Sequence, residues 1–378
     1  MHLVFLTNEY PYKALPHGGI GTFVQNLARN LVKKGISVSV IGITSSDKNI
    51  GEELDEGVKI YSIKQSSAKF GKFIFNSFRI QKKIKEINKI LAVDIVEGSE
   101  LSFAFLPKRT FYKKVIRMHG GHHFFAITLN KKTAFWRAFQ EKQSFKKADA
   151  LIAVSNYVGE TTQQLLQFKL SFKTIYNFID FGKFNNENEI KQELNAILFI
   201  GTICEKKGVK QLVEAFSIVK KKIPNATLHL VGRDWSNNTI KSYINHIKTI
   251  IPLEDLKAIK FYGTMPYYAI PEILAKAHVC VYPSHMESFG LTLVEAMAMH
   301  KPIVYSNIPP FNEIITNEVS GLACNPFNSN DIAQKIIKIL INKELGIKLS
   351  ENAKNEVINK FSATKLVKEN INFYNSIV

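Results

Sequence analysis

The sequence predicts a protein of the α/β class, built from two doubly wound domains that face a cleft. Its 378 residues are too many for one ordinary hydrophobic core and are typical of two domains of about 150 to 200 residues each. Each half alternates short apolar segments with segments of three- and four-residue periodicity, as strands and helices do. A polar stretch with four asparagines, at residues 181–195, is predicted as the linker. We therefore expect domains at residues 1–183 and 184–361.

The first elements form a strand, a helix and a second strand. Residues 2–7 are an apolar strand, a loop with the sequence HGGIGT follows, and a helix at residues 22–34 ends before Gly35. Residues 38–43 form the next strand, so the crossover should be right-handed. A dinucleotide site is the competing interpretation, but GGIG lacks the GxGxxG spacing, and Asp47 lies beyond the end of the second strand. The pattern therefore disfavours NAD.

A basic amphipathic helix is predicted within residues 64–91. Apolar positions recur there at steps of three and four residues, and lysines occupy the rest of the helical wheel. The stripe consists of Phe73, Ser77, Ile80, Ile84, Ile87 and Leu91. We expect it to pack against the N-terminal sheet. The alternative is docking onto a bilayer through Phe70, Phe73, Phe75 and the lysines, which would suit a lipid-linked acceptor.

Three histidines follow a strand predicted at residues 115–118. His119, His122 and His123 lie within five residues of one another, as the ligands of a metal ion do in some proteins. However, no carboxylate or cysteine stands at ligand spacing nearby, so the pattern does not predict a metal site. The other elements predicted in this half are strands at residues 94–97 and 148–155 and a helix at residues 136–147.

The second half repeats the alternation of strands and helices. Its strands are predicted at residues 196–201, 227–232, 259–263 and 279–282, and its helices at residues 209–218, 291–299, 331–341, 349–360 and 362–377. A glycine-rich turn precedes the helix at residues 209–218, and a loop at residues 283–290 leads directly into the helix at residues 291–299. Both helices therefore present an N-terminus just after a strand ends.

The loop and helix after the strand at residues 279–282 carry the functional pattern. Unpaired N–H groups and the positive end of the dipole make a helix N-terminus a site for phosphate. Glu287 lies in the loop, and Glu295 lies about one turn inside the helix. Two carboxylates that flank a phosphate-binding turn suit a ligand with hydroxyl groups at both ends and a diphosphate between them. This arrangement predicts a sugar nucleotide.

The net charge of +18 is concentrated in the first half. Residues 1–185 hold 28 Lys and Arg against 14 Asp and Glu, whereas the rest holds 22 against 18. Such an excess attracts phosphates, nucleic acid or an anionic bilayer. Nucleic acid ranks last, because no aromatic and basic recognition motif accompanies the charge. The apolar runs are too short for a membrane helix, and the start of the chain lacks the features of a signal peptide. With three widely spaced cysteines, we expect a cytoplasmic protein with reduced thiols.

Several motifs resemble those of retaining glycosyltransferases of family 4, which have the GT-B fold. They are PSHMESFGLTLVE, which holds Glu287 and Glu295, then AMAMHKPIV, FYGTMPYYAIPEILAKAHVCVYPS and SGLACNPFNSNDIAQKI. The resemblance implies two Rossmann-like domains. Residues 1–183 would bind the acceptor and residues 184–361 the nucleotide sugar, with a last helix at residues 362–378 that crosses back to the first domain.

The resemblance also implies roles for individual residues. The catalytic residues would be His119, Lys207 and Glu287, with Lys207 neutralising the donor diphosphate and Glu287 binding hydroxyl groups of the donor sugar. The donor-binding residues would be Gly18, Gly19, Thr202, Lys207, Gly263, Thr264, Met265, Glu287, Ser288, Phe289, Gly290, Leu291, Thr292 and Glu295. Glu295 would hold the ribose, while His122, His123, Glu97 and Glu100 are candidate acceptor contacts. Thr202 stands where family members often have an arginine, and Lys206 is a partial substitute.

The reaction implied is transfer of a sugar from a nucleoside diphosphate sugar, with a UDP-sugar favoured over GDP-mannose. The acceptor would be a hydroxyl of a glycan or a lipid-linked intermediate of surface polysaccharide or glycoconjugate synthesis. No D-x-D motif stands in the sequence, so we expect no metal and no cofactor. Alternatives are a non-catalytic sugar-nucleotide-binding protein and a GT-B epimerase or phosphorylase. We expect a cytoplasmic location. The alternative is a cytoplasmic protein that also contacts the anionic inner face of the membrane peripherally.

Overall fold

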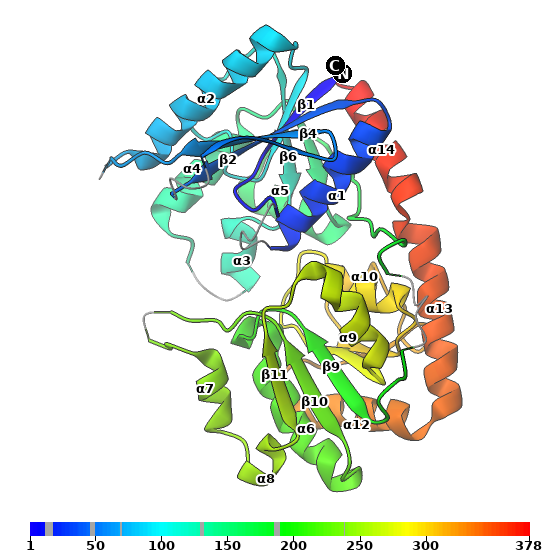
Figure 1. Cartoon of the computed structure of the whole chain (residues 1–378). Coiled ribbons are helices and arrows are strands. Elements are labelled where there is room, and N and C mark those ends of the chain that lie inside the picture. Colours follow the sequence, from blue (N-terminus) through cyan, green and yellow to red (C-terminus); the bar gives the residue numbers. More distant parts are fainter. Residues whose placement is uncertain (12–17, 46–49, 69, 129–131, 185–189, 238) are drawn as a thin grey trace. The chain divides into compact units, whose positions relative to one another are not determined.

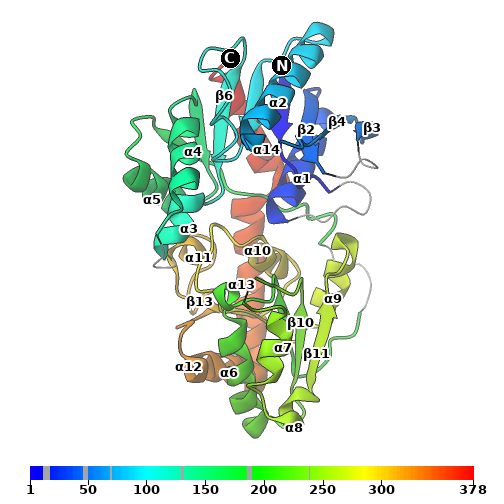
Figure 2. The same ribbon diagram turned by 90° about the vertical axis from the view of Figure 1, so that its left-hand side faces the viewer.

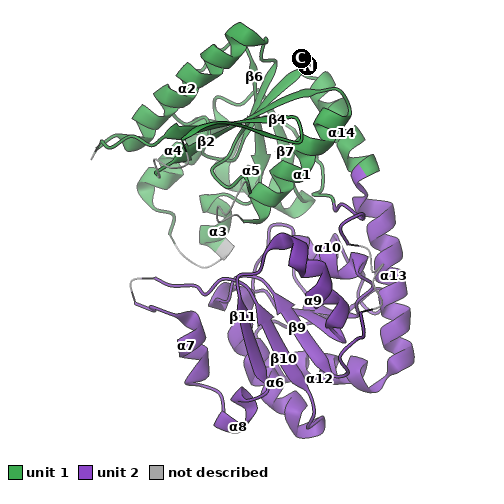
Figure 3. Ribbon diagram, in the orientation of Figure 1, with its two compact units in different colours: residues 1–178, 364–378 green, residues 179–363 purple. Residues whose placement is uncertain are grey.

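The computed structural model describes residues 1–11, 18–45, 50–68, 70–128, 132–184, 190–237 and 239–378 (Figures 1 and 2). The chain forms two compact units (Figure 3). Unit 1 comprises Met1–Phe178 and Thr364–Val378, and unit 2 comprises Ile179–Ala363. The central part of the predicted linker, residues 185–189, lies outside the described residues, as do Asp47 and the first residue of the HGGIGT loop.

Unit 1 is built on an eight-stranded sheet of order β3-β4-β2-β1-β5-β6-β7-β8. The strands are β1 His2–Leu6, β2 Ser37–Thr44, β3 Gly51–Asp55, β4 Val58–Lys64, β5 Ile95–Gly98, β6 Lys113–Met118, β7 Ala150–Ala153 and β8 Phe172–Thr174. All neighbouring pairs are parallel except β3 and β4. These two form a hairpin around Glu56 and Gly57, which both have positive φ as a two-residue turn requires.

Helices cover both faces of the sheet of unit 1. They are α1 Gly19–Lys33, α2 Lys72–Ile90, α3 His122–Thr128, α4 Phe135–Phe145, α5 Asn156–Leu166 and α14 Ala363–Asn375. In Figure 1, α1 and α14 lie on one side of the sheet, and α2 and α4 lie on the other. As predicted, α1 ends just before Gly35, whose positive φ suits the left-handed position after a helix.

A buried polar network attaches α14 to the sheet of unit 1. The Arg117 guanidinium on β6 donates to both oxygens of Glu97 on β5, at 2.7 and 3.3 Å. It also donates to Asn370 Oδ1 at 2.6 Å and to Tyr374 Oη at 3.1 Å. The Tyr374 hydroxyl in turn donates to Glu97 Oε2 at 2.7 Å. The predicted return of the last helix to the first domain is therefore confirmed. The fully buried guanidinium of Arg117 makes the hydrogen bonds that attach this helix.

The predicted packing of α2 is only half correct. Ile84 and Ile87 are buried against the sheet, as expected. Phe73 and Leu91, at the two ends of the predicted stripe, are 45% and 46% exposed. The stripe is too long for the sheet, so its first turns extend beyond the core and their aromatic rings face solvent.

Unit 2 is built on a six-stranded parallel sheet of order β11-β10-β9-β12-β13-β14. Its strands are β9 Ala196–Ile200, β10 Thr227–Val231, β11 Ile259–Gly263, β12 Val279–Tyr282, β13 Ile303–Ser306 and β14 Leu322–Cys324. Its helices are α6 Val209–Lys222, α7 Tyr243–Lys248, α8 Leu253–Leu256, α9 Ile270–Lys276, α10 Leu291–Ala298, α11 Pro309–Asn312, α12 Ser329–Ile341 and α13 Lys343–Phe361, with 3-10 turns η2 Glu205–Lys207 and η3 Tyr267–Ala269.

Apolar side chains from alternate strand positions form the core of unit 2 together with α6 and α12. Ile197, Phe199 and Leu228 of the strands pack there with Phe216 of α6 and Ile336 of α12. On another side of the unit, α10 packs against α13. The strand β9 lies between β10 and β12, so the turns after β9 and β12 emerge side by side. This edge holds the candidate site of unit 2. In the part of the chain that the structure describes, no helix is long and apolar enough to cross a membrane.

Candidate active site

The turn into α10 is built around a glycine that no other residue could replace without strain. Gly290 has φ 109°, and a Cβ there would overlap the ring of Phe311. Among the described residues, no side chain caps the helix. The first N–H groups of α10, at Leu291 and Thr292, are therefore left for a ligand, at the positive end of the helix dipole.

A charged cluster lies in the loop that leads to α10. Lys207 Nζ forms an ion pair with Glu287 Oε1, and Ser284 Oγ donates to the same oxygen at 3.0 Å. The structure thus brings together Lys207 and Glu287, two of the three predicted catalytic residues. Their side chains are 25% and 12% exposed, so the pair is accessible to a ligand although it is largely shielded from water.

Two close contacts between backbones fix this cluster. Gly208 has φ 67°, and a Cβ at this position would overlap the carbonyl oxygen of Pro283. The N–H of His285 donates to the carbonyl of Lys206 at 2.9 Å. The turn after β9 and the loop after β12 are therefore held against each other. Phe289, a predicted donor-binding residue, instead packs its ring edge-on against Phe361, so only its backbone can serve a ligand.

Lys206, the proposed substitute for the family arginine, lies in the same turn. Burial lowers the pKa of its ammonium to about 8, although the nearby carboxylate of Glu287 acts in the opposite direction. Thr202 follows β9 at the same edge of the sheet and is partly buried. A lysine with this pKa is only partly uncharged at neutral pH, so most of the molecules carry two ammonium groups beside Glu287.

Glu295 is buried inside α10, where its carboxyl accepts a hydrogen bond from Tyr267 Oη at 3.0 Å. Burial raises the pKa of Glu295 to about 8, so the group is mostly protonated at neutral pH and can donate as well as accept. Tyr267 belongs to η3, just after the predicted base-reading segment of Gly263, Thr264 and Met265. The hydrogen bond therefore connects the segment after β11 to the helix after β12.

Three glycines occupy the carboxyl ends of neighbouring strands in unit 2. Gly201, Gly232 and Gly263 follow or end β9, β10 and β11, and all have positive φ. The N–H of Gly232 donates to the carbonyl of Gly263 at 2.8 Å, and a Cβ on Gly232 would overlap the carbonyl of Gly201. Side chains are thus excluded from this part of the edge, which leaves backbone groups exposed to a ligand.

In unit 1, the predicted catalytic His119 follows β6 directly. Its N–H donates to Glu100 Oε1 at 2.5 Å, and its ring packs edge-on against Phe23 at a centroid distance of 6.1 Å. Burial and, to a lesser extent, the charge of Arg117 lower the pKa of His119 to about 3. The imidazole is therefore uncharged at neutral pH, and it can act through hydrogen bonds rather than as a cation.

Gly18 and Gly19 begin α1, and Gly18 is its N-cap residue. Gly18 has φ −113°, which any residue adopts, so backbone angle does not explain the glycine. Instead, a Cβ at Gly18 would crowd the carboxylate of Glu9, at 2.8 Å from Oε2. Because this carboxylate is the far end of a flexible side chain, it could shift, so the contact disfavours a side chain at Gly18 without excluding one.

The other polar residues of this region are tied to one another. His123 pairs with the buried Glu141 through Nδ1 and through its own N–H, the latter at 3.0 Å. Glu97 lines the cavity described below, and its two oxygens accept hydrogen bonds from Arg117 and Tyr374. Glu100 is buried against the backbone of His119, and burial raises its pKa to about 7. Within the described ranges, no cluster of three or more His, Cys, Asp or Glu could hold a metal ion.

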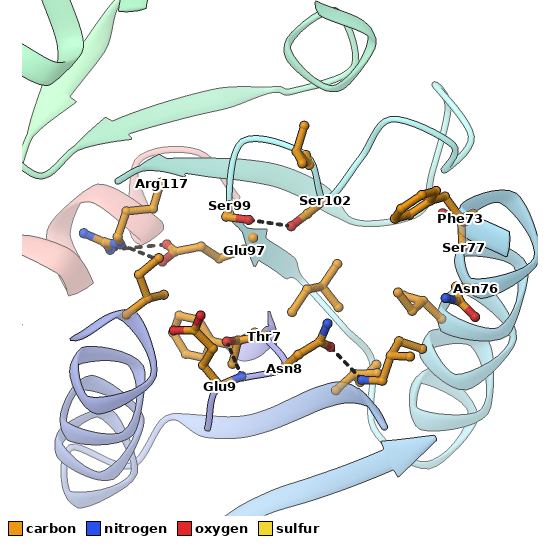
Figure 4. Close-up of a pocket in the computed structure, with 18 of the residues that line it drawn as sticks. Thr7, Asn8, Glu9, Phe73, Asn76, Ser77, Glu97, Ser99, Ser102 and Arg117 are labelled. Atoms are coloured by element: carbon orange, nitrogen blue, oxygen red, sulfur yellow. Dashed lines mark hydrogen bonds and ion pairs between the residues drawn. The ribbon is translucent and has the colours of Figure 1, made fainter. Parts of the chain in front are cut away.

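A cavity of about 370 Å³ lies in unit 1 at the carboxyl ends of β1, β5 and β6 (Figure 4). His119 contributes to its wall, and Phe73 of α2 borders it on another side. Besides His119, its polar lining consists of Thr7, Asn8, Glu9, Gln65, Asn76, Ser77, Glu97, Ser99, Ser102, Arg117, Arg137 and Gln140. Hydroxyl and amide groups of this kind bind sugar hydroxyls. Sequence reasoning missed this lining, although Thr7 and Asn8 directly follow a strand and Ser99 follows another.

The fold and the two sets of residues define a glycosyltransferase of the GT-B type. Sucrose-phosphate synthase from Thermosynechococcus elongatus has the same fold, with a TM-score of 0.84 and 17% identity over 99% of this chain and 98% of that one. Anabaena HepE in complex with UDP and glucose gives a TM-score of 0.80 and 16% identity, with both chains covered completely. The predicted fold class is therefore confirmed.

The sequence comparisons identify the family. The model described as Glycosyltransferase Family 4 matches residues 17–183, and the one described as Glycosyl transferases group 1 matches residues 180–356. The chain belongs to glycosyltransferase family 4 and is a transferase, as the sequence motifs predicted. An uncharacterised glycosyltransferase of Methanocaldococcus jannaschii is 26% identical over 95% of this chain and 93% of its own length. The capsular polysaccharide biosynthesis glycosyltransferase CapM of Staphylococcus aureus is 24% identical over 72% of this chain and 71% of its own.

Proposed function

We propose that this glycosyltransferase moves a sugar from a nucleoside diphosphate sugar to a hydroxyl group and retains the anomeric configuration. The observation that carries the proposal is the cluster of Lys207, Glu287 and Ser284 beside the uncapped N-terminus of α10. An ammonium and free N–H groups suit a diphosphate, and a carboxylate suits sugar hydroxyls. The buried Glu295 with Tyr267 is the proposed ribose site, and the backbone at residues 263–265 is the proposed base site.

The main barrier of the reaction is the departure of the diphosphate while positive charge develops on the sugar. Lys207 and the N–H groups of Leu291 and Thr292 would stabilise that leaving group, with Gly18 and Gly19 providing further N–H groups. Glu287 is assigned no nucleophilic role. We expect the acceptor to attack on the face from which the diphosphate leaves, and the departing phosphate to take the proton. His119, uncharged at neutral pH, would hold a hydroxyl of the donor sugar.

A UDP-sugar is the favoured donor and GDP-mannose the alternative. The favoured assignment is supported by structures with the same fold that were determined with UDP, namely those of HepE and of TarM from S. aureus. For the acceptor, we propose a hydroxyl of a glycan or a lipid-linked intermediate, bound in the cavity of unit 1. Its polar lining supports this assignment, as does the similarity to a glycosyltransferase of capsular polysaccharide biosynthesis. A cytoplasmic location with peripheral membrane contact is part of the same proposal.

Thermal unfolding of the purified protein tests the donor site. UDP, GDP, ADP and NAD are added in turn, each with and without a chelator. A ligand at about 100 times its dissociation constant stabilises the folded state by roughly 2.7 kcal/mol, which moves the midpoint by a few degrees. We expect UDP alone to raise the midpoint, with or without chelator. The variant Lys207→Ala should lose this shift. The control Lys210→Ala, in the first turn of α6, should keep it.

Two outcomes would contradict the proposal. A shift with NAD alone would mean that the glycine loop and the glutamates are both misassigned. Transfer from a sugar 1-phosphate with release of inorganic phosphate, without release of UDP from a UDP-sugar in the presence of acceptors, would identify a phosphorylase instead of a transferase.

A further inference from the structure

The first half of α2 presents aromatic side chains to solvent. Phe75 and Phe78 are 50% and 66% exposed, whereas Ile84 and Ile87 on the opposite side are buried. Along the exposed side, Phe75 and Phe78 are followed at steps of three and four residues by Lys82, Lys85 and Lys89. All five therefore lie on one face of the helix, with rings at its first turns and ammonium groups at its later turns.

Helix α4 extends this aromatic surface. Phe135 is 85% exposed, and Trp136 stacks between Phe105 and Phe139 at centroid distances of 5.8 and 5.6 Å. The guanidinium of Arg137 lies over the ring of Phe73 at 5.5 Å, so α2 and α4 are in contact. Of the exposed phenylalanines and tryptophans in the described residues, all but Phe327 lie between residues 70 and 139. Most of these rings lie on the two helices, with Phe70 just before α2, whereas Phe111 lies apart from them, just before β6.

The surroundings of these rings are strongly basic. Residues 64–147 hold 19 Lys and Arg against 5 Asp and Glu, so this segment accounts for a charge of +14. Four of the five acidic groups are already paired or buried inside the unit. These are Asp94, Glu97, Glu100 and Glu141. The fifth, Glu86, pairs with Lys83. Among the cations, Arg117 and Lys114 are buried and paired, whereas Lys82, Lys85 and Lys89 are exposed on the face of α2 that carries Phe75 and Phe78.

We propose that this surface of α2 and α4 docks onto an anionic lipid bilayer. Aromatic rings insert at the boundary between head groups and acyl chains, and lysines beside them pair with anionic head groups. A second copy of this chain is a poor partner, since contact would bring two positive fields together. The proposal deepens the function given above and rests on it for its purpose. Phe73 and Arg137 border the cavity proposed for the acceptor, so a docked enzyme would present that cavity to lipid-linked molecules.

Co-sedimentation with vesicles tests the docking. Vesicles of phosphatidylcholine with 30% phosphatidylglycerol are compared with pure phosphatidylcholine, at about physiological salt. The test variant changes Phe75 and Phe78 to Ser and Lys82 and Lys85 to Glu. The matched control makes the same four changes at exposed positions of unit 2. These are Leu253→Ser, Ile341→Ser, Lys257→Glu and Lys348→Glu.

A second measurement reports on insertion. The chain has two tryptophans, so Trp235→Phe leaves Trp136 as the sole tryptophan, which is excited selectively over the tyrosines. Vesicles with brominated acyl chains should quench its emission if α4 reaches the acyl region. The stabilisation by UDP is measured on every variant as a check of folding and of the donor site, which α2 does not contain.

We expect wild-type protein to bind the anionic vesicles, the test variant to bind at least fivefold more weakly, and the control to stay within twofold. Emission of Trp136 should be quenched. Absence of binding, a smaller loss in the test variant, an equal loss in the control or unquenched emission each overturns the docking proposal. None of these results bears on the UDP shift. A missing UDP shift with intact vesicle binding would overturn the UDP-sugar assignment alone.

Discussion

Lys207 and Glu287 neutralise each other in the structure without ligand, where both are largely shielded from water. A diphosphate would compete with Glu287 for the ammonium, and a sugar hydroxyl would then take the place of the ammonium at the carboxylate. The ion pair thus holds two groups of opposite function at the position where the bond between sugar and phosphate would break. Ser284, which donates to the same oxygen, keeps Glu287 oriented during that exchange.

Two substitutions separate the roles of the glutamates. Glu295→Gln should weaken UDP binding by about fivefold, the equivalent of one hydrogen bond, with a smaller effect on turnover. Glu287→Gln should lower kcat by about 100-fold and leave UDP binding within threefold, because its contacts would be to the sugar in the transition state. Calorimetric titration with UDP and initial rates with a UDP-sugar measure the two effects. Wild-type behaviour of both variants would refute the assignment.

Lys206 predicts a dependence of donor binding on pH. Its pKa of about 8 means that the ammonium loses its charge as the pH rises from 7 to 9. If the charge contacts the diphosphate, UDP binding should weaken over this range, by up to about tenfold at pH 9. Lys206→Arg should remove the part of the dependence that comes from Lys206, because arginine stays charged, and should leave the part that comes from Glu295, whose pKa is also about 8. If the UDP dissociation constant varied with pH in the same way in the two proteins, Lys206 would not substitute for the family arginine that Thr202 replaces.

The sequence motifs predicted the charged residues of the site better than the side chains that form hydrogen bonds with them. Glu287, Glu295 and Lys207 stand in motifs with fixed spacing, and all three lie at the same edge of unit 2. Tyr267 and Ser284 could not be predicted, because only the fold brings them to the carboxyl groups. Glu97 lines the cavity, but its pairing with Arg117 and Tyr374 could not be predicted for a related reason. Its partner Tyr374 is 277 residues away in sequence.

At the scale of elements, most strands with continuous apolar sequences were predicted within one or two residues, but the buried strand β13, Ile303–Ser306, was missed. The strand β12, at Val279–Tyr282, has the predicted bounds, and α10 ends one residue earlier than expected. The hairpin of β3 and β4 was missed, since GEELD at Gly51–Asp55 is acidic and exposed on one edge of the sheet. Strands that lie at an edge have little apolar pattern to reveal them.

The hydrogen bonds that attach α14 to the sheet of unit 1 can be tested by removing one hydroxyl group. Tyr374→Phe removes a hydroxyl that donates to Glu97 and accepts from Arg117 in a fully buried network. The loss should destabilise unit 1 by about 1–3 kcal/mol. Tyr268→Phe, at a position that is 85% exposed, is the matched control and should leave stability unchanged. Chemical denaturation followed by circular dichroism measures both. Equal stabilities would mean that packing alone holds the helix.

At the scale of the whole molecule, each unit has its own sheet and its own core, so the two should unfold separately. Calorimetry should then resolve two transitions, and UDP should raise only the one that Tyr374→Phe does not lower, because the proposed nucleotide site belongs to unit 2. A UDP shift of the transition that Tyr374→Phe lowers would place the nucleotide in unit 1. The length of the chain and the alternation of strands and helices predicted the two doubly wound sheets. The charges of α2 did not decide whether this helix packs against the sheet or docks onto a bilayer.

The division of the chain also has a consequence for its synthesis. Unit 2 is one continuous segment, Ile179–Ala363, whereas unit 1 is completed by Thr364–Val378. Once the ribosome has released residue 363, every strand of unit 2 is available for folding. The buried Arg117, made early, has to wait for Asn370 and Tyr374. We therefore expect unit 1 to reach its native state only after the last helix has emerged, although most of its residues are made before those of unit 2.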